Sequence, residues 1–257
     1  MNILYIHQYF ATPKGKTGTR SYEFSKRWVN AGHNVTMLTT IAQLSDEEIS
    51  HSKGNVIKRL NIDGITVCAF NLPYNQKMSV VKRSLSFVGF FVLATFFLLF
   101  TKKPDIVYAT STPLTVGIPA LVAKWLRRIP FVFEVRDQWP EIPIELGIIK
   151  NRVMIKILLW LEKTIYKNSS AIVAGSPGQA DGIKKIAAKD KIVKVIPNSC
   201  DIEVFRPDID GSVVRKKYGW ENKFIFLHVG AMGKINDLGF VIKAALKLKD
   251  TPEILFV

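Results

Sequence analysis

Short apolar runs alternate with amphipathic segments along most of the chain. The apolar runs, rich in Val, Ile, Leu and Phe, occupy residues 2–6, 35–39, 65–70, 106–109, 131–135, 171–174 and 192–196. Runs of this length and composition are typical of strands in a parallel sheet that is covered on both faces. The segments that predict helices lie at residues 20–31, from 113, at 151–166 and from 176. The alternation predicts a doubly wound α/β domain over residues 1–205.

Residues 84–100 depart from this pattern because they carry no charge and are apolar on every helical face. Such a helix belongs in a protein core or in lipid. At ~1.5 Å per residue the run reaches about 25 Å, which is shorter than the ~30 Å hydrocarbon core of a bilayer. Crossing would also put the flanking strands on opposite sides of the membrane, and one sheet could not form. We therefore expect a crossover helix that lies at the membrane interface or dips into it, with burial by protein on both faces as the alternative.

Basic and aromatic side chains around this run favour the membrane interpretation. The chain has 36 Lys and Arg against 21 Asp and Glu, which gives a net charge of +15. Such a surplus usually serves nucleic acid, anionic lipid or phosphorylated small molecules, and no nucleic-acid-binding motif occurs here. We expect an anionic membrane surface as a partner and no nucleic acid, with a solvated basic surface as the alternative. The basic groups near the run are Lys77, Lys82, Arg83, Lys102, Lys103, Lys124, Arg127 and Arg128, and the side chains expected to face the membrane are Phe90, Phe91, Phe96 and Phe97.

Two further features bear on the location of the protein. Cys68 and Cys200 are far apart in sequence and form no metal-binding pattern, which favours a reducing compartment. The chain enters a strand at its N-terminus without the layout of a signal peptide. We expect a peripheral protein on the cytoplasmic face of the inner or plasma membrane. Residues 150–167, which are basic and amphipathic, are predicted either to face lipid or to pack on the core.

The last part of the chain starts a second pattern. Residues 196–207 have the composition of an interdomain connection, and a strand at 224–229, a helix at 237–249 and a strand at 254–257 follow. About fifty residues with two strands cannot bury a core of their own. We expect residues 206–257 to be the incomplete start of a second domain, continued by further sequence or by a second chain that supplies the remainder.

A glycine-containing loop follows the first predicted strand. Gly15 and Gly18 are placed for a tight turn into the helix that begins at Arg20, and amides at such a helix N-terminus bind anions. A P-loop would need Gly where Phe10 stands. A dinucleotide fingerprint would need an acidic residue at the end of the second strand, where Thr40 stands. We predict an anion-binding loop that does not bind NAD, with a simple glycine turn as the alternative.

Residues 130–141, PFVFEVRDQWPE, form the densest cluster of candidate site residues. A buried strand carries Glu134, Arg136 and Asp137 to its carboxyl end, where ligands bind in open α/β sheets. Arg136 is suited to phosphate or carboxylate, Asp137 to a sugar hydroxyl or an incoming acceptor, and Trp139 to stacking. An Arg–Asp pair that only closes the strand–helix loop is the alternative.

Together these motifs resemble the retaining glycosyltransferases of family 4, which have the two-domain GT-B fold. The shared segments are HQYF, TGTRSYEF, STPLTVGIPA, PFVFEVRDQWPE, AGSPGQADGI and IPNSCDIEVFRPD. The similarity covers the whole chain and points to the fucosaminyltransferase-like subgroup of surface polysaccharide assembly. It implies transfer, with retention, of a sugar from a UDP- or GDP-linked nucleotide sugar, without a metal or other cofactor. The implied acceptor is a polyprenyl-diphosphate-linked sugar that binds the first domain.

The resemblance also implies roles for individual residues. Arg136 and Asp137 stand where the family has its catalytic residues, although many members have His-Asp there, so a histidine role is not carried over. Glu134 and Trp139 are expected to bind the acceptor. The residues expected to bind the phosphates of the donor are Gly18, Arg20, Gly230, Gly233 and Lys234.

Two departures from the family pattern limit what the chain is expected to do alone. The donor loop commonly has Gly-Arg and then Lys, whereas residues 230–234 read GAMGK. The family's glutamate motif, which holds the donor sugar and ribose, would fall after Val257. We therefore expect this chain alone to be inactive in transfer. The alternatives are a non-catalytic membrane-docking half of a split glycosyltransferase and a GT-B-type epimerase.

Overall fold

The computed structural model describes residues 1–15, 17–72, 74, 78–230, 232–233 and 236–257. Lys77 and Lys234, which are both named above, lie outside the described residues. The chain divides into two units, Met1–Asn198 and Ser199–Val257, so the division falls before the expected boundary at residue 205.

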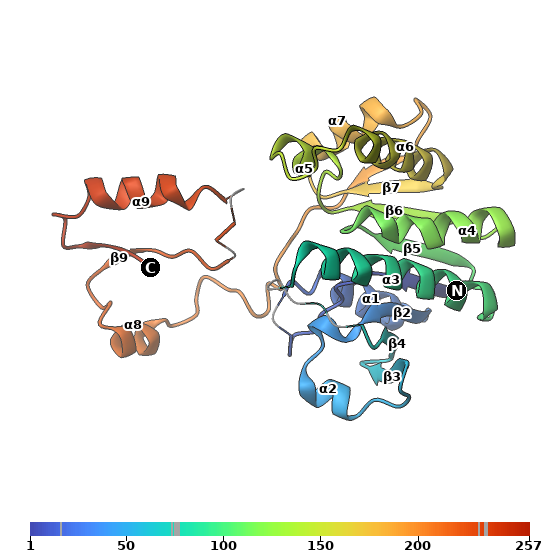
Figure 1. The fold of residues 1–257 in the computed structure, drawn as a ribbon. Helices are drawn as coiled ribbons and strands as arrows, with labels where there is room; N and C mark the ends of the chain where they lie inside the picture. The colour runs from blue at the N-terminus through green and yellow to red at the C-terminus, as the bar shows by residue number, and fades with distance from the viewer. Residues whose placement is uncertain (16, 73, 75–77, 231, 234–235) are drawn as a thin grey trace. The chain divides into compact units, whose positions relative to one another are not determined.

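An eight-stranded sheet forms the centre of the first unit, with the strand order β3-β4-β2-β1-β5-β6-β7-β8 (Figure 1). The strands are β1 Asn2–Ile6, β2 Asn34–Thr40, β3 Ile57–Ile62, β4 Ile65–Phe70, β5 Ile106–Thr110, β6 Phe131–Val135, β7 Ala171–Ala174 and β8 Val193–Val195. All neighbouring strands pair in parallel except β3 and β4. This sheet confirms the predicted α/β class, because each apolar run became one of its parallel strands.

The edge strand β3 is missing from the prediction. It pairs with β4 in antiparallel fashion through a turn at Asp63 and Gly64, whose φ angles are 48° and 82°. Positive φ at both central residues is what the tight hairpin turn requires, and Asp-Gly is a common solution. The signal was therefore present, but β3 carries Lys58, Arg59 and Asn61 and lacks the apolar run that marks the other strands.

Helices cover the two faces of the sheet (Figure 1). On one face lie α1 Arg20–Asn30 and α2 Asp46–Ser50. On the other face lie α3 Val80–Phe100, α4 Gly117–Arg127, α6 Arg152–Asn168 and α7 Pro177–Ile186. The remaining short helices of this unit are η1 Ile41–Gln43, η2 Leu114–Val116 and α5 Glu141–Glu145.

The two cores follow from the alternation of side chains along the strands. In β1, Leu4 and Ile6 point into the core under α3 and α4, whereas Ile3 and Tyr5 point into the core under α1. Both sets are buried, so the near-continuous apolar run that predicted β1 reflects a strand covered on both faces.

The apolar helix α3 has one buried and one exposed face. Phe90, Ala94 and Leu98 are fully buried and recur every fourth residue, and the Phe90 ring lies 5.9 Å from that of Phe70 in β4. The exposed side chains of the opposite face are Val81, Leu85, Val88, Val92, Phe96 and Phe100. An outward face this apolar is unusual for a crossover helix, because solvent-facing helical positions normally carry polar residues.

This arrangement corrects the expectation that Phe90, Phe91, Phe96 and Phe97 all face outward. Phe90 is buried against the sheet, and Phe97 is half-buried against the same core. Phe91 is half-buried as well, and Phe96 alone of the four is exposed, at 56%. The sequence could not separate them, because a run that is apolar all round gives no periodicity from which to choose a face.

By length and composition, residues Val81–Phe100 could cross a membrane. The fold argues against a crossing, since β4 and β5 on either side of α3 belong to the same sheet. The helix also packs along α4. α3 is therefore a crossover helix whose free side is apolar.

The second unit consists of α8 Ser212–Tyr218, β9 Phe224–Phe226, α9 Leu238–Lys247 and β10 Ile254–Phe256. β9 and β10 pair in parallel, as expected of a β–loop–α–β unit. β9 ends at Phe226, before the predicted end at residue 229.

Candidate functional site

A buried hydrogen-bond network lies beneath the carboxyl ends of β1, β5 and β6. Glu134 of β6 is buried, and its Oε2 accepts a hydrogen bond from Thr110 Oγ1 at 2.7 Å. The hydroxyl of Tyr5 donates to the same oxygen at 3.4 Å. Burial and the adjacent Glu134 carboxylate raise the pKa of Tyr5 well above its usual value, so the phenol stays protonated and able to donate.

Arg20, the first residue of α1, closes this network. Its Nε donates to Glu134 Oε1 at 2.8 Å. Its two terminal nitrogens donate to the carbonyl oxygens of Pro197 at 2.8 Å and Ile196 at 2.6 Å. The guanidinium therefore joins α1 and β6 to the segment after β8. This geometry favours a structural role for Arg20 and Glu134 over the phosphate and acceptor contacts expected of them.

His7 lies just after β1 and is also buried. Its Nδ1 is 2.9 Å from Ser21 Oγ in the first turn of α1. Burial, together with the Arg136 guanidinium, lowers the pKa of His7 to about 3. The imidazole is therefore neutral at neutral pH and does not repel Arg136.

Arg136 follows β6 directly and is half-buried at the edge of the sheet. Its backbone amide donates to Ser111 Oγ at 3.1 Å, which fixes the start of the loop. Its guanidinium makes no hydrogen bond or ion pair with the part of the chain that the structure describes. A Cβ added to Gly18 would lie 3.8 Å from Nη2, so the glycine loop and the guanidinium border the same space.

The start of α1 adds to this anion-binding potential. Thr19 occupies the N-cap position without making a side-chain hydrogen bond to the first turn. Backbone amides at a helix N-terminus that lack a capping side chain can bind an anion. Together with Arg136 and Gly18, they form an arrangement suited to phosphate or carboxylate.

Asp137 is exposed next to Arg136, and its Oδ2 accepts a hydrogen bond from Thr112 Oγ1 at 2.6 Å. The structure thus brings the predicted pair Arg136 and Asp137 to one edge, with the loops after β5 and β6 holding both. Trp139, expected to stack on an acceptor, is half-buried and packs against the core beneath α3 and α4.

The sequence interpretation missed the last residue of β5 and the two residues that follow it. Thr110 bonds Glu134, Ser111 positions Arg136, and Thr112 holds Asp137. Three consecutive hydroxyl residues at the carboxyl end of an apolar strand were the available signal, because such side chains tie neighbouring loops together at this edge of a sheet.

Gly230 and Gly233, two of the predicted donor-binding residues, lie in the loop after β9. Gly230 is exposed, and a Cβ there would lie 3.5 Å from the His228 ring. Apart from its chain neighbours, no atom of the described residues lies within 4 Å of a Cβ added to Gly233. Lys234 is outside the described residues, so its predicted phosphate contact stays a prediction. Across the described ranges, no three His, Cys, Asp or Glu side chains gather as metal ligands would.

The chain matches the family model described as "Glycosyl transferase 4-like domain" over residues 17–199. A comparison with curated protein sequences finds no significant match. Among solved structures, the Anabaena protein HepE in complex with UDP and glucose is similar at a TM-score of 0.60 and 17% identity, covering 99% of this chain and 59% of HepE. Sucrose-phosphate synthase from Thermosynechococcus elongatus is similar at 0.60 and 12%, covering 100% and 70%. A UDP-N-acetylglucosamine 2-epimerase is similar at 0.53 and 12%, covering 100% and 62%. These likenesses show a GT-B-like α/β fold, of which this chain spans part.

Proposed function

Because the chain belongs to the glycosyl transferase 4-like family, we propose that it is the acceptor-binding side of a retaining glycosyltransferase that works at a membrane. The donor would be a UDP- or GDP-linked sugar, and the acceptor a polyprenyl-diphosphate-linked sugar of surface polysaccharide assembly, as in fucosaminyltransferase-like enzymes. The complexes of HepE with UDP and glucose support a UDP-linked donor. The family also supports transfer rather than epimerisation, which would need no lipid acceptor.

One observation carries the membrane part of this proposal: three neighbouring helices expose apolar side chains. We call this set the outer helical surface. Its members are Val81, Leu85, Val88, Val92, Phe96 and Phe100 of α3, Trp125 and Leu126 of α4, and Val153, Met154, Ile157 and Trp160 of α6. Apolar side chains in such number on adjacent helices mark an interaction surface, since exposed apolar residues of soluble proteins are usually scattered.

Hydrogen bonds tie α4 to α3 on one side and to α6 on the other. Arg127 of α4 donates to the carbonyl oxygens of Leu98 and of Thr101, the latter at 3.0 Å, and so holds the end of α3. Trp125 of α4 donates from Nε1 to Asn168 Oδ1 of α6 at 3.1 Å. Arg127 is therefore used as a helix cap and is less available to lipid than the sequence suggests.

The charge of this surface supports lipid as the proposed occupant. α3, α4 and α6 contain a single acidic residue, Glu162, and it is buried. Apart from Arg127, the basic residues of these helices and of their ends are Lys82, Arg83, Lys102, Lys103, Lys124, Arg128, Lys150, Arg152, Lys156, Lys163 and Lys167. An apolar face with cationic and no anionic flanks matches an anionic bilayer, whereas a protein partner would usually be met by both signs of charge.

The surface also reaches the edge of the sheet that carries Arg136. Phe87, in the second turn of α3, stacks on Tyr74 with ring centroids 6.0 Å apart. Tyr74 in turn lies 4.9 Å from Tyr9, which follows β1. The first turns of α3 therefore lie beside the carboxyl end of β1, where a lipid-borne diphosphate could leave the membrane and meet Arg136.

In this proposal each edge residue has a task. Arg136 and the amides at the start of α1 neutralise a phosphate, and Asp137 accepts a hydrogen bond from the hydroxyl of the acceptor sugar. Arg20 and Glu134 hold these loops in place from beneath. The peripheral, cytoplasmic location expected above belongs to the same proposal.

The test measures binding of the chain to vesicles of neutral and anionic lipid, with and without a polyprenyl-diphosphate-linked sugar. We expect binding to anionic vesicles, strengthened by the lipid-linked sugar. Arg136→Ala should remove only the added strength, because it faces the sheet edge, and Arg59→Ala on the edge strand β3 is the matched control.

Vesicle binding that the lipid-linked sugar leaves unchanged would contradict the acceptor assignment. The absence of binding to any vesicle would contradict the membrane assignment and leave the epimerase as the better reading. Robust sugar transfer by this chain alone would overturn the expectation that it is inactive by itself.

A further inference from the structure

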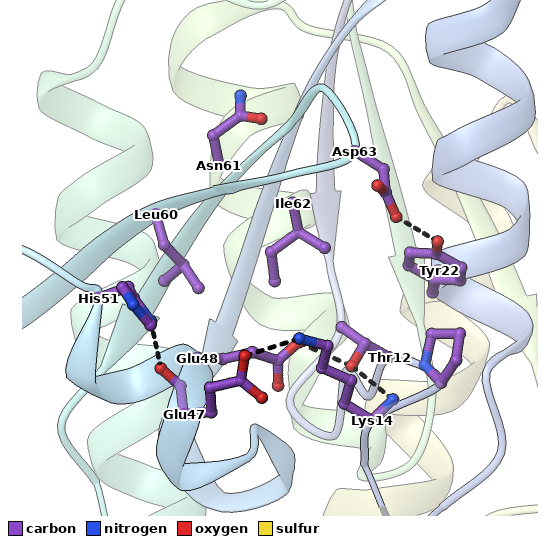
Figure 2. Close-up of a pocket in the computed structure, with 11 residues that line it drawn as sticks. Thr12, Lys14, Tyr22, Glu47, Glu48, His51, Leu60, Asn61, Ile62 and Asp63 are labelled. Atoms are coloured by element: carbon purple, nitrogen blue, oxygen red, sulfur yellow. Dashed lines mark hydrogen bonds and ion pairs between the residues drawn. The ribbon is translucent and has the colours of Figure 1, made fainter.

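A pocket of about 500 Å³ lies between α1, α2 and β3 (Figure 2). This is the face of the sheet opposite to α3, α4 and α6. Its wall is formed by the start of the glycine loop at Thr12, by Tyr22 of α1, by Glu47 of α2 and by Asp63 at the tip of the β3–β4 hairpin. None of the residues assigned above to the Arg136 site lines it. A cavity of this volume is large enough for a small organic ligand.

The pocket is lined by the aromatic ring of Tyr22, by the apolar side chains of Leu60 and Ile62, and by side chains that can form hydrogen bonds. Figure 2 shows Tyr22 beside Asp63 on one side of the pocket, with Leu60 and Ile62 of β3 across from Lys14. A saccharide presents the complementary surface, since its C–H faces pack on aromatic and aliphatic groups while its hydroxyls both donate and accept.

Several polar atoms that line the pocket can still form hydrogen bonds with such a ligand. Glu47 Oε1 accepts from Lys14 Nζ at 2.9 Å, and Asp63 Oδ2 accepts from the Tyr22 hydroxyl. No hydrogen bond from the described residues reaches Glu47 Oε2 or Asp63 Oδ1, and Lys14 Nζ keeps further protons to donate. Two neighbouring hydroxyls of a sugar can therefore form hydrogen bonds at the same time, one donating to a free carboxylate oxygen and the other accepting from Lys14 Nζ.

The charge of the pocket lining indicates which class of sugar it can bind. The carboxylates at the pocket are Glu47, Glu48 and Asp63, and among the lining residues that the structure describes Lys14 is the one Lys or Arg. In a chain of net charge +15, this is a locally anionic site. It would repel phosphorylated sugars, uronic acids and nucleotides while accepting neutral sugars.

We infer that this pocket binds an uncharged sugar residue and, resting on the proposed function, that this sugar belongs to the glycan of the acceptor. The glycine loop supports the connection, because it starts at the pocket with Thr12 and Lys14 and ends at Gly18 beside Arg136. One loop thus carries both the phosphate-binding edge and the sugar pocket.

The test titrates the chain, without lipid or nucleotide, with lactose, cellobiose, N,N′-diacetylchitobiose and cellobiuronic acid, followed by saturation-transfer NMR. We expect at least one neutral disaccharide to bind and cellobiuronic acid not to bind. The double variant Glu47→Gln, Asp63→Asn should weaken the neutral ligand about tenfold, the loss typical of one hydrogen bond to a charged group. Asn tolerates the positive φ at position 63, so this variant should fold.

The matched control is Glu23→Gln, Asp46→Asn, which removes two carboxylates from α1 and α2 outside the pocket lining and should leave affinity unchanged. Equal weakening in both double variants, binding of the uronic acid, or no neutral ligand at all would overturn the inference. These outcomes are independent of vesicle binding, so they can be told apart from a failure of the proposed function.

Discussion

The two helical layers of the first unit cover the same sheet but present opposite chemistry outward. α1 and α2 have polar outer faces with both signs of charge, such as the Glu23–Arg27 pair at 2.5 Å and the acids at the start of α2. α3, α4 and α6 have apolar outer faces with basic flanks and a single, buried acid. Each layer covers an apolar core on its own face of the sheet, so covering the sheet does not by itself explain the different outer faces. The difference indicates what each layer meets outside the protein.

The difference also divides the proposed acceptor between the faces. In the proposal, the lipid binds the outer helical surface, the diphosphate binds the edge at Arg136, and the neutral sugar binds the pocket between α1, α2 and β3. The glycine loop after β1 connects the last two regions, because it lines the pocket with Thr12 and Lys14 and brings Gly18 beside Arg136. A molecule with a lipid end and a sugar end would have a place for each.

The inner and outer faces of α3 should respond most differently to substitution. Phe90→Ala removes a fully buried ring and should lower the free energy of unfolding by about 3 to 5 kcal/mol. Phe96→Ala truncates an exposed ring and should cost less than about 1 kcal/mol. Denaturant unfolding of both variants checks this, and equal losses would mean that α3 is oriented differently.

The outer face of α3 should dominate vesicle binding. The triple variant Leu85→Ser, Val92→Ser, Phe96→Ser removes three exposed apolar side chains, each contributing about 1 kcal/mol at a lipid interface, so affinity should fall roughly a hundredfold. Val56→Ser, an exposed apolar position before β3, is the control and should bind normally. If the triple variant floats with vesicles as the native chain does, the claim that the outer face of α3 binds the membrane is contradicted.

The basic flanks should contribute less, and in a salt-dependent way. Neutralising Arg152 and Lys156 of α6 to Gln removes about 1 kcal/mol each near anionic headgroups, which is about thirtyfold together at low salt and less at high salt. The same neutralisation of Lys26 and Arg27 on α1 should leave vesicle affinity nearly unchanged. An equal loss of vesicle affinity from both pairs would indicate that the net charge of the protein, and not the outer helical surface, attracts the vesicles.

The buried acid of α6 sets a pH dependence on stability. Burial raises the pKa of Glu162 to about 7. A carboxyl whose folded pKa lies above its unfolded value binds more protons in the folded state, so stability falls as pH rises from about 4.5 through 7. Glu162→Gln should remove this fall and stabilise the protein at pH 8 by roughly 1 to 2 kcal/mol, with little effect at pH 4.5. Thermal melts at both pH values test this, and identical pH profiles would contradict it.

The sequence predicted the strands well because strands covered on both faces leave long apolar runs, and it predicted that α3 exists for the same reason. It could not predict which side of α3 faces outward, since Phe90 and Phe96 are chemically alike and only packing on Phe70 distinguishes them. Likewise, Arg20 and Glu134 were visible as charges near the sheet edge. Their pairing depends on contacts across 114 positions, which local pattern does not encode.

The most direct test of whether the outer helical surface binds the membrane is quenching of tryptophan fluorescence by brominated lipid in anionic vesicles. Trp125 and Trp160 lie exposed on the outer helical surface, at 53% and 63%, whereas Trp28 packs into the core beneath α1. At lipid concentrations where flotation shows the chain fully bound, Trp125→Phe, Trp160→Phe should lose most of the quenching and Trp28→Phe should keep it. Quenching that persists in the double variant, or that disappears with Trp28, would contradict the claim that α3, α4 and α6 form the membrane-facing side.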